Sequence, residues 1–193
     1  MKNNDITAKN IYIIGIGGTL MGGVAIMLKN AGFNIVGSDN VLYPPMSDEL
    51  KKTNIKIFEG YSEKNISDDI DLVLVGNVVS KGHIEMEEVI KRNIPYISVP
   101  SFLEKYILPE YTPVVITGTH GKTTTSSLTT TVFDYLGFNP SFLIGGVHQN
   151  YNLNGKLDKT NSPFVLEGDE YDTAFYDKVP KFSHYLTKVG VVT

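Results

Sequence analysis

Short apolar runs alternate with amphipathic stretches through the N-terminal half of the chain. We predict strands at residues 11–15, 34–37, 56–59, 71–76 and 95–98, and helices near residues 20–31, 46–53 and 84–93. Strand–helix alternation of this kind is typical of a parallel sheet with right-handed crossovers. The pattern therefore predicts an α/β fold that opens with a Rossmann-like domain over residues 1–108.

The end of that domain carries its own signals. In SFLEKYIL, residues 101–108, Ser101 is the expected N-cap of a further helix and Glu104 stands at the third helical position, as in a capping box. The next segment, PEYTP at residues 109–113, contains two prolines. We interpret it as a hinge between two domains.

After the hinge the alternation resumes. Strands are expected in PVVITG, SFLIGG, PFVLEG and VGVVT, with one helix running to about Leu136. The polar stretch 148–162 is rich in turn residues, which favours a surface loop. We predict that residues 109–193 form the first part of a second α/β domain. Because a covered α/β sheet needs more elements than these, we expect the chain to be the N-terminal part of a longer protein.

Composition narrows the possible partners. The chain of 193 residues has 17 Lys and Arg against 21 Asp and Glu, a net charge of −4, and no cysteine. Without a basic cluster, a nucleic-acid partner is not expected. No apolar run approaches the length of a membrane span, and the N-terminus lacks the core of a signal peptide, so we predict no membrane partner and a cytoplasmic protein. A phosphorylated small molecule is still a possible ligand for a chain of this charge, because backbone amides can bind phosphate without a net positive charge on the protein.

The segment GTHGKT, residues 118–123, joins an apolar strand to a Thr/Ser-rich helix. Such a turn points unpaired backbone N–H groups at one place, where a triphosphate would satisfy them. Lys122 would add a charged donor, and the Thr123 hydroxyl could hold Mg²⁺. The loop is shorter than the common P-loop, since Ile116 stands where the first glycine belongs. The alternative is a glycine turn with an unrelated lysine.

A P-loop needs a distant carboxylate at the end of a neighbouring strand to hold the metal. In FVLEGDEYD, residues 164–172, Glu167 ends the apolar run and is the metal candidate. The alternative is a solvated loop of acidic residues. Of the four histidines, which lack metal-ligand spacing, only His120 lies in the phosphate loop, where it could touch a nucleotide.

A second glycine-rich turn, GIGGTLMGG at residues 15–23, follows the first strand. With Asp39 after the second strand it suggests a dinucleotide fingerprint, but Leu20 occupies the position of the third glycine. The turn therefore supports a nucleotide diphosphate at a helix N-terminus without specifying nicotinamide. A purely structural tight turn is the alternative.

With these motifs, the chain resembles the Mur ligases, ATP-dependent enzymes of bacterial peptidoglycan synthesis. GTHGKTTT resembles the ATP loop of the family, and GIGG with the following MGG resembles its UDP-muramate-binding first domain. GTLMGG, SDNVLYPPMS and EGDEYDTAFYDKVPKFSHY favour the recycling branch, which joins UDP-N-acetylmuramate to L-alanyl-γ-D-glutamyl-meso-diaminopimelate. The branch that adds L-alanine usually reads EADESD where this chain has EGDEYD at 167–172, and it remains the alternative.

The resemblance implies that residues 109–193 are the first part of a P-loop α/β ATPase domain. It also implies ATP and Mg²⁺ as cofactors, and UDP-N-acetylmuramate with a peptide or amino acid as substrates. It implies Lys122 and Glu167 as catalytic residues, and Thr123 and Glu167 as metal ligands. The implied ATP site comprises Gly118, Thr119, His120, Gly121, Lys122, Thr123 and Thr124. The implied UDP-muramate site comprises Gly15, Gly17, Gly18, Ser38, Asp39, Asn77 and Ser80.

Two other functional hypotheses stay open. One is a binding module that holds UDP-muramate or ATP without turnover. The other is a nicotinamide oxidoreductase that rests on residues 15–39, but this hypothesis leaves the loop at residues 118–123 without a role.

Overall fold

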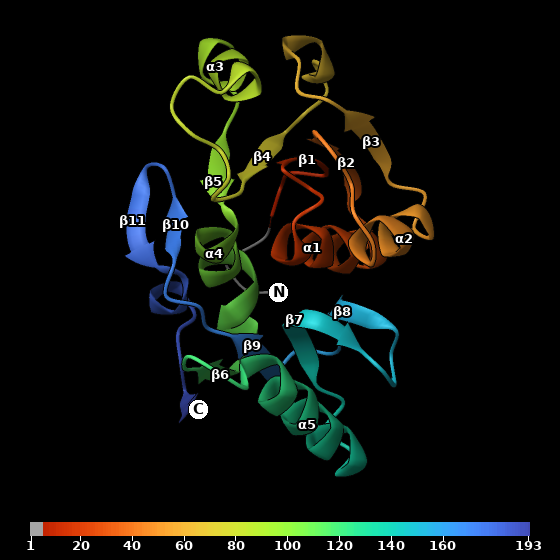
Figure 1. The fold of residues 1–193 in the computed structure, drawn as a ribbon, viewed down its shortest axis with the longest axis vertical. Coiled ribbons are helices and arrows are strands. Elements are labelled where there is room, and N and C mark those ends of the chain that lie inside the picture. The colour runs from red at the N-terminus through yellow and green to blue at the C-terminus, as the bar shows by residue number, and fades with distance from the viewer. Residues whose placement is uncertain (1–5) are drawn as a thin grey trace.

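The computed structural model describes residues 6–193 of the chain. Within this range the molecule is built on two five-stranded sheets that follow one another along its long axis, with α1 and α4 between them (Figure 1). A separate two-stranded hairpin lies beside α4 (Figure 1). The predicted α/β fold, with a Rossmann-like first sheet, is confirmed; the second sheet is mixed.

The first sheet has the strand order β3-β2-β1-β4-β5, and all its strands run parallel. Its strands are β1 (Asn10–Ile14), β2 (Asn34–Asp39), β3 (Lys56–Glu59), β4 (Leu72–Val75) and β5 (Tyr96–Ser98). The crossover helices are α1 (Thr19–Asn30), α2 (Met46–Lys51) and α3 (Ile84–Lys91), and a 3₁₀ turn spans Glu63–Asn65. Both faces of β1 are buried, with Ile11 and Ile13 in one apolar cluster and Tyr12 and Ile14 in another. Burial on both faces explains why the parallel strands are continuous apolar runs.

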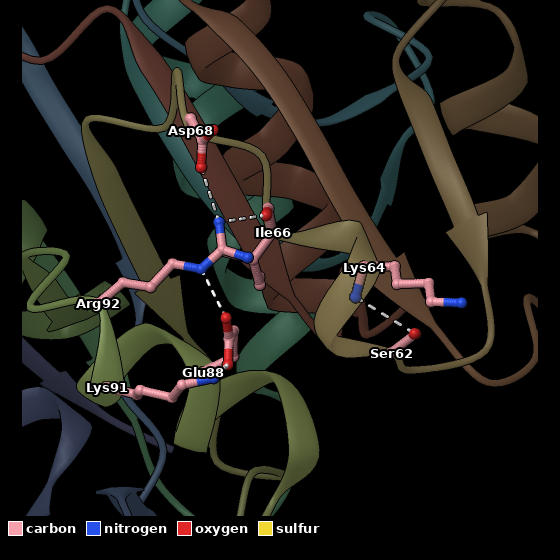
Figure 2. A network of polar contacts seen from close by, with 7 residues as sticks. All are labelled: Ser62, Lys64, Ile66, Asp68, Glu88, Lys91 and Arg92. Carbon is pink, nitrogen blue, oxygen red and sulfur yellow. Dashed lines mark hydrogen bonds and ion pairs between the residues drawn. The ribbon is translucent and has the colours of Figure 1, made fainter.

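An arginine at the end of α3 fastens the chain between β3 and β4 to this helix (Figure 2). Arg92 donates from Nε to Glu88 and from a terminal nitrogen to the carbonyl of Ile66 and to Asp68, at 2.6 Å, 2.9 Å and 2.9 Å. Lys91 pairs with the same Glu88 at 2.9 Å. The two cations lower the pKa of the Glu88 carboxyl, so this residue stays ionised.

The helix that follows β5 begins earlier than predicted. It starts as α4 (Val99–Phe102), continues as a π-helical turn (Leu103–Ile107) and ends in a 3₁₀ turn (Leu108–Glu110). The hydroxyl of Ser98 accepts the N–H of Ser101 at 3.3 Å, so Ser98 is the N-cap and the prediction of Ser101 was wrong. Pro100 lies in the first turn, where the fixed φ of proline suits a helix start. Glu104 pairs with His184 at 2.6 Å instead of forming a capping box.

The second sheet has the order β12-β6-β9-β7-β8, with β8 as its antiparallel strand. Its strands are β6 (Thr112–Thr117), β7 (Ser141–His148), β8 (Leu153–Lys156), β9 (Pro163–Glu167) and β12 (Val189–Val192). The single long helix α5 (Lys122–Tyr135) packs on this sheet, and β10 (Asp172–Ala174) and β11 (Asp177–Pro180) form the hairpin. A last 3₁₀ turn spans Lys181–His184.

Strand β8 corrects the prediction of a surface loop at residues 148–162. Asn154 is fully buried and donates its amide to the carbonyl of Thr19 in α1 at 2.8 Å. A Cβ on Gly155 would lie 2.8 Å from the carbonyl oxygen of Gly23, so only glycine allows this close approach to α1. Asn154 is a polar residue at a buried position because it meets a helix backbone, and this contact ties the second sheet to the first.

Over residues 6–193, none of the helices combines the length and the apolar character that crossing a membrane requires.

Candidate functional site

A cavity of about 490 Å³ lies between the two sheets. The first sheet contributes the glycine turn after β1, Asp39 at the end of β2, and residues 76–78 after β4. The second sheet contributes residues 143–145, Glu167, and three residues of the segment that follows it, Asp169, Thr173 and Lys181. In parallel sheets, ligands bind outside the carboxyl ends of the strands, and this cavity has that position.

The glycine turn after β1 is held in place by hydrogen bonds to β2. The N–H groups of Gly15 and Ile16 both donate to the carbonyl of Ser38, at 2.9 Å and 3.0 Å, and Gly15 has a φ of +79°. The N–H of Gly17 donates to the Asp39 carboxylate at 2.8 Å. The helix α1 then begins at Thr19, so its first free N–H groups lie at the cavity wall. This is the geometry of an anion-binding helix N-terminus.

Asp39 is already engaged by this turn. Its two oxygens accept the N–H groups of Gly17 and Asn40, each at 2.8 Å, and the hydroxyl of Tyr61 lies 3.3 Å from one of them. Burial, reinforced by the Asp39 charge, raises the pKa of Tyr61 to about 12, so this phenol keeps its proton near neutral pH. Asp39 therefore positions the turn, and sequence reasoning missed Tyr61 as its partner.

The structure gathers most of the residues expected at the UDP-muramate site, but not all. Gly15, Gly17, Gly18, Asp39 and Asn77 line the cavity. Ser38 is fully buried, and its hydroxyl donates to Glu85 at 2.5 Å, so it does not line the cavity. Ser80 lines a separate hollow beside the β10–β11 hairpin, which Asn77 also borders.

The phosphate loop, residues 118–123, lies at the end of β6. Gly118 and Gly121 have φ values of +132° and +79°, which side-chain-bearing residues rarely adopt, and α5 starts directly at Lys122. The Lys122 ammonium donates to the carbonyl of Gly118 at 2.6 Å and so crosses the loop. Gly121, the N-cap residue, has no side chain to satisfy the N–H groups of α5, and they remain available to an anion.

The other predicted ATP-loop residues surround this turn. His120 is exposed, and its ring nitrogen lies 3.2 Å from the Thr119 hydroxyl. Thr124 is also exposed, on the first turn of α5. The hydroxyl of Thr193 donates to the carbonyl of His120 at 2.6 Å, and this residue packs closely on Gly118. The loop is therefore held by Thr193, the residue after β12, as well as by its own lysine.

Glu167 connects the phosphate loop to β7. One of its oxygens accepts the Thr123 hydroxyl at 3.2 Å, and the other accepts the N–H of Gly145 at 2.8 Å. A hydroxyl and a carboxylate side by side are the hard oxygen ligands that suit Mg²⁺. Among residues 6–193 there is no group of three or more His, Cys, Asp or Glu side chains that could hold a metal. The donor set fits a Mg²⁺ that also takes phosphate and water ligands, as this ion usually does.

Lys181 is a cavity residue that sequence reasoning missed. Its ammonium lies 2.8 Å from the Asp169 carboxylate, and its side chain is only 8% exposed. The residue pattern does not distinguish it from Lys178 on the same segment, an exposed lysine with an ordinary surface pair to Asp172. The two lysines differ in burial, and the fold decides which of them is buried.

Comparison with known proteins agrees with this arrangement. The profile of the Mur ligase family, catalytic domain, matches residues 10–111. The UDP-N-acetylmuramate--L-alanyl-gamma-D-glutamyl-meso-2,6-diaminoheptandioate ligase of Escherichia coli (strain K12) is 42% identical over 94% of this chain and 40% of its own length. The UDP-N-acetylmuramate--L-alanine ligase of Buchnera aphidicola is 36% identical over 93% of this chain and 36% of its own.

A solved structure shows the same fold. The crystal structure of the UDP-N-acetylmuramate:L-alanyl-gamma-D-glutamyl-meso-diaminopimelate ligase from Neisseria meningitides superposes with a TM-score of 0.90 at 41% identity. The match covers 95% of this chain and 60% of that one. The chain spans about two-fifths of the length of the curated relatives that it matches.

Proposed function

The chain belongs to the Mur ligase family, and from this premise we propose that it forms the nucleotide-binding part of an ATP-dependent ligase. The ligase joins UDP-N-acetylmuramate to L-alanyl-γ-D-glutamyl-meso-diaminopimelate in peptidoglycan recycling. Residues 1–108 bind the UDP-sugar, and residues 109–193 bind ATP. Both nucleotides are cytoplasmic metabolites, so we place the reaction in the cytoplasm.

The observation that carries the proposal is the shared cavity. The glycine turn at residues 15–18 lines it from the first sheet, and Glu167, which contacts Thr123 of the phosphate loop, lines it from the second. A ligase must bring the carboxylate of a nucleotide sugar to the γ-phosphate of ATP. One anion-binding helix start at the cavity wall, and a second that contacts the cavity residue Glu167, suit this task, whereas a nicotinamide oxidoreductase would need only the first.

The proposed chemistry has two steps. A carboxylate oxygen of the muramate takes the γ-phosphoryl group, which gives an acyl phosphate and ADP. The amine then attacks the acyl carbon, and the tetrahedral intermediate expels phosphate and leaves an amide. Lys122 and the loop amides stabilise the charge on the transferred phosphoryl oxygens. Mg²⁺ held by Thr123 and Glu167 would neutralise part of the same charge.

The tripeptide is favoured over L-alanine as the amine substrate. The E. coli tripeptide ligase shares 42% identity with the chain, and the Buchnera L-alanine ligase shares 36%. The segment EGDEYD at 167–172 also departs from the EADESD of the L-alanine branch. L-alanine ligation remains the second candidate, because relatives of that kind match most of the chain.

Calorimetry and a ligation assay test the proposal. We expect the 193-residue chain to bind UDP-N-acetylmuramate and not NAD⁺. Because it spans about two-fifths of its relatives, we expect no amide formation when ATP, Mg²⁺ and tripeptide are added. Catalysis depends on holding both reactants in near-attack geometry, worth roughly 7–11 kcal/mol when complete. Failure of a folded sample to bind the UDP-sugar would refute the proposed site. Amide formation would refute the expected inactivity, and substituting L-alanine for the tripeptide would identify the amine.

A further inference from the structure

The cavity contains a buried cation that the proposed function does not yet use. Lys181 begins the last 3₁₀ turn (Lys181–His184), and its side chain is 8% exposed. Its one hydrogen-bond partner in the described structure is Asp169, at 2.8 Å. An ammonium has three N–H donors. Two of them therefore have no partner among the described residues, and Lys181 lines the cavity.

The charges around the cavity make this lysine distinctive. Among the described residues that line the cavity, three are acidic, Asp39, Glu167 and Asp169, and Lys181 is the only basic one. A UDP-sugar with a carboxylate brings further negative charge into this space. The glycine turn offers backbone N–H groups to the diphosphate, but only Lys181 offers the cavity a full positive charge.

The position of Lys181 points to the reacting end of the ligand. It lies on the second-sheet side of the cavity, paired with Asp169, which is two residues beyond Glu167. Glu167 contacts the phosphate loop, and the glycine turn lies on the first-sheet side. A UDP-sugar whose diphosphate lies at the glycine turn can therefore place its sugar end on the Lys181 side of the cavity.

We propose that Lys181, held in place by Asp169, binds the carboxylate of the lactyl ether of UDP-N-acetylmuramate. This inference rests on the proposed function. It makes Lys181 a specificity-determining residue, because UDP-N-acetylglucosamine has the same uridine, diphosphate and amino sugar but lacks the lactyl carboxylate. Asp169 is a positioning residue, which keeps the ammonium in the cavity wall.

Calorimetry with these two UDP-sugars separates binding of the carboxylate from a purely structural role. We expect the wild-type chain to bind UDP-N-acetylmuramate roughly 10- to 100-fold more tightly than UDP-N-acetylglucosamine, the range for one charge-assisted hydrogen bond. Lys181→Gln should remove most of this preference and leave the affinity for UDP-N-acetylglucosamine within about threefold. If Lys181 only neutralised Asp169, the variant would weaken both ligands alike.

A matched pair of variants guards against misfolding. Lys181→Gln leaves the Asp169 carboxylate without its cation, which could destabilise the fold. The double variant Lys181→Gln/Asp169→Asn avoids this, because it replaces the ion pair by two amides that can hydrogen-bond to each other. It should fold and should also lack the preference. Asp169→Asn alone retains the ammonium and also an amide oxygen that can accept from it and position it, so this variant should keep most of the preference.

The outcomes distinguish this inference from the proposed function. A folded wild-type chain that binds neither UDP-sugar would overturn both. Binding of both sugars with the preference retained in the Lys181 variants would overturn the inference and leave the proposed function standing. Equal affinity of the wild type for the two sugars, or an equal loss for both in Lys181→Gln, would also overturn it.

Discussion

Glu85 is fully buried in the first turn of α3, and its removal should be among the costliest single changes in the first sheet. One of its oxygens accepts the Tyr12 hydroxyl at 3.0 Å, the N–H of Ser62 at 3.2 Å and the Asn65 amide at 2.8 Å. The other accepts the Ser38 hydroxyl at 2.5 Å. Burial raises the pKa of Tyr12, so its hydroxyl remains a donor throughout the working pH range.

The expected loss of stability follows from these four donors. Glu85→Ala removes the acceptor of the Tyr12 and Ser38 hydroxyls, and both residues are completely buried. Ser62 and Asn65 are half-buried and can turn to water. With about 1–3 kcal/mol for each buried donor left unpaired, plus the lost packing, we expect a loss of roughly 3–5 kcal/mol. In Glu85→Gln a carbonyl oxygen still accepts from three donors, and the Ser38 hydroxyl can rotate to accept the new amide N–H. We therefore expect this variant to lose about 1 kcal/mol of stability.

Urea unfolding followed by circular dichroism measures both variants against the wild type. Loss of the Glu85 carboxylate should also disturb the glycine turn, because the carbonyl of Ser38 accepts the N–H groups of Gly15 and Ile16. We therefore expect weaker UDP-N-acetylmuramate binding in any Glu85→Ala protein that remains folded. A loss below about 1 kcal/mol for alanine, or equal losses for alanine and glutamine, would refute the idea that this carboxylate satisfies four donors.

Three further predictions concern the turn, the metal and pH. Gly17→Ala should lower the stability measured by thermal unfolding by about 1–3 kcal/mol, because its Cβ would lie 2.8 Å from an Asp39 carboxylate oxygen. Gly18→Ala should be nearly neutral, because no atom would lie nearer to its Cβ than 3.6 Å. Equal losses would contradict this account. In ATP-binding titrations, Glu167→Gln should weaken Mg²⁺ dependence more than Asp169→Asn, because Glu167 contacts the phosphate loop whereas Asp169 is already paired with a lysine. A larger effect at Asp169 would reassign the metal carboxylate. Burial lowers the pKa of His83, so its contribution to stability is complete above the unfolded-state pKa of about 6.5 and is lost as the pH falls toward the lower folded-state value. His83→Gln should flatten the fall in urea midpoint between about pH 7 and pH 5, and an unchanged slope would mean that other groups cause it.

The sequence alone determined the features that depend on local pattern. The apolar runs located β1, β2, β4, β6 and β9, because a strand buried on both faces must be apolar at nearly every position. The glycines at residues 15–18 and 118–121 identified two turns into helix N-termini, since such turns need positive φ or close backbone approach. Glu167 could be selected because it is the first carboxylate after a buried strand.

Tertiary structure decided which polar residues are buried and what they contact. Strand β8 is polar in sequence but packs on α1, with its Asn154 amide bonded 135 residues away. Ser38 looks like an exposed loop residue and is buried against Glu85, 47 positions along the chain. Lys181 resembles its neighbour Lys178, yet only Lys181 enters the cavity. Each outcome depends on partners far apart in sequence, and a buried polar group is stable only when the fold brings such a partner to it.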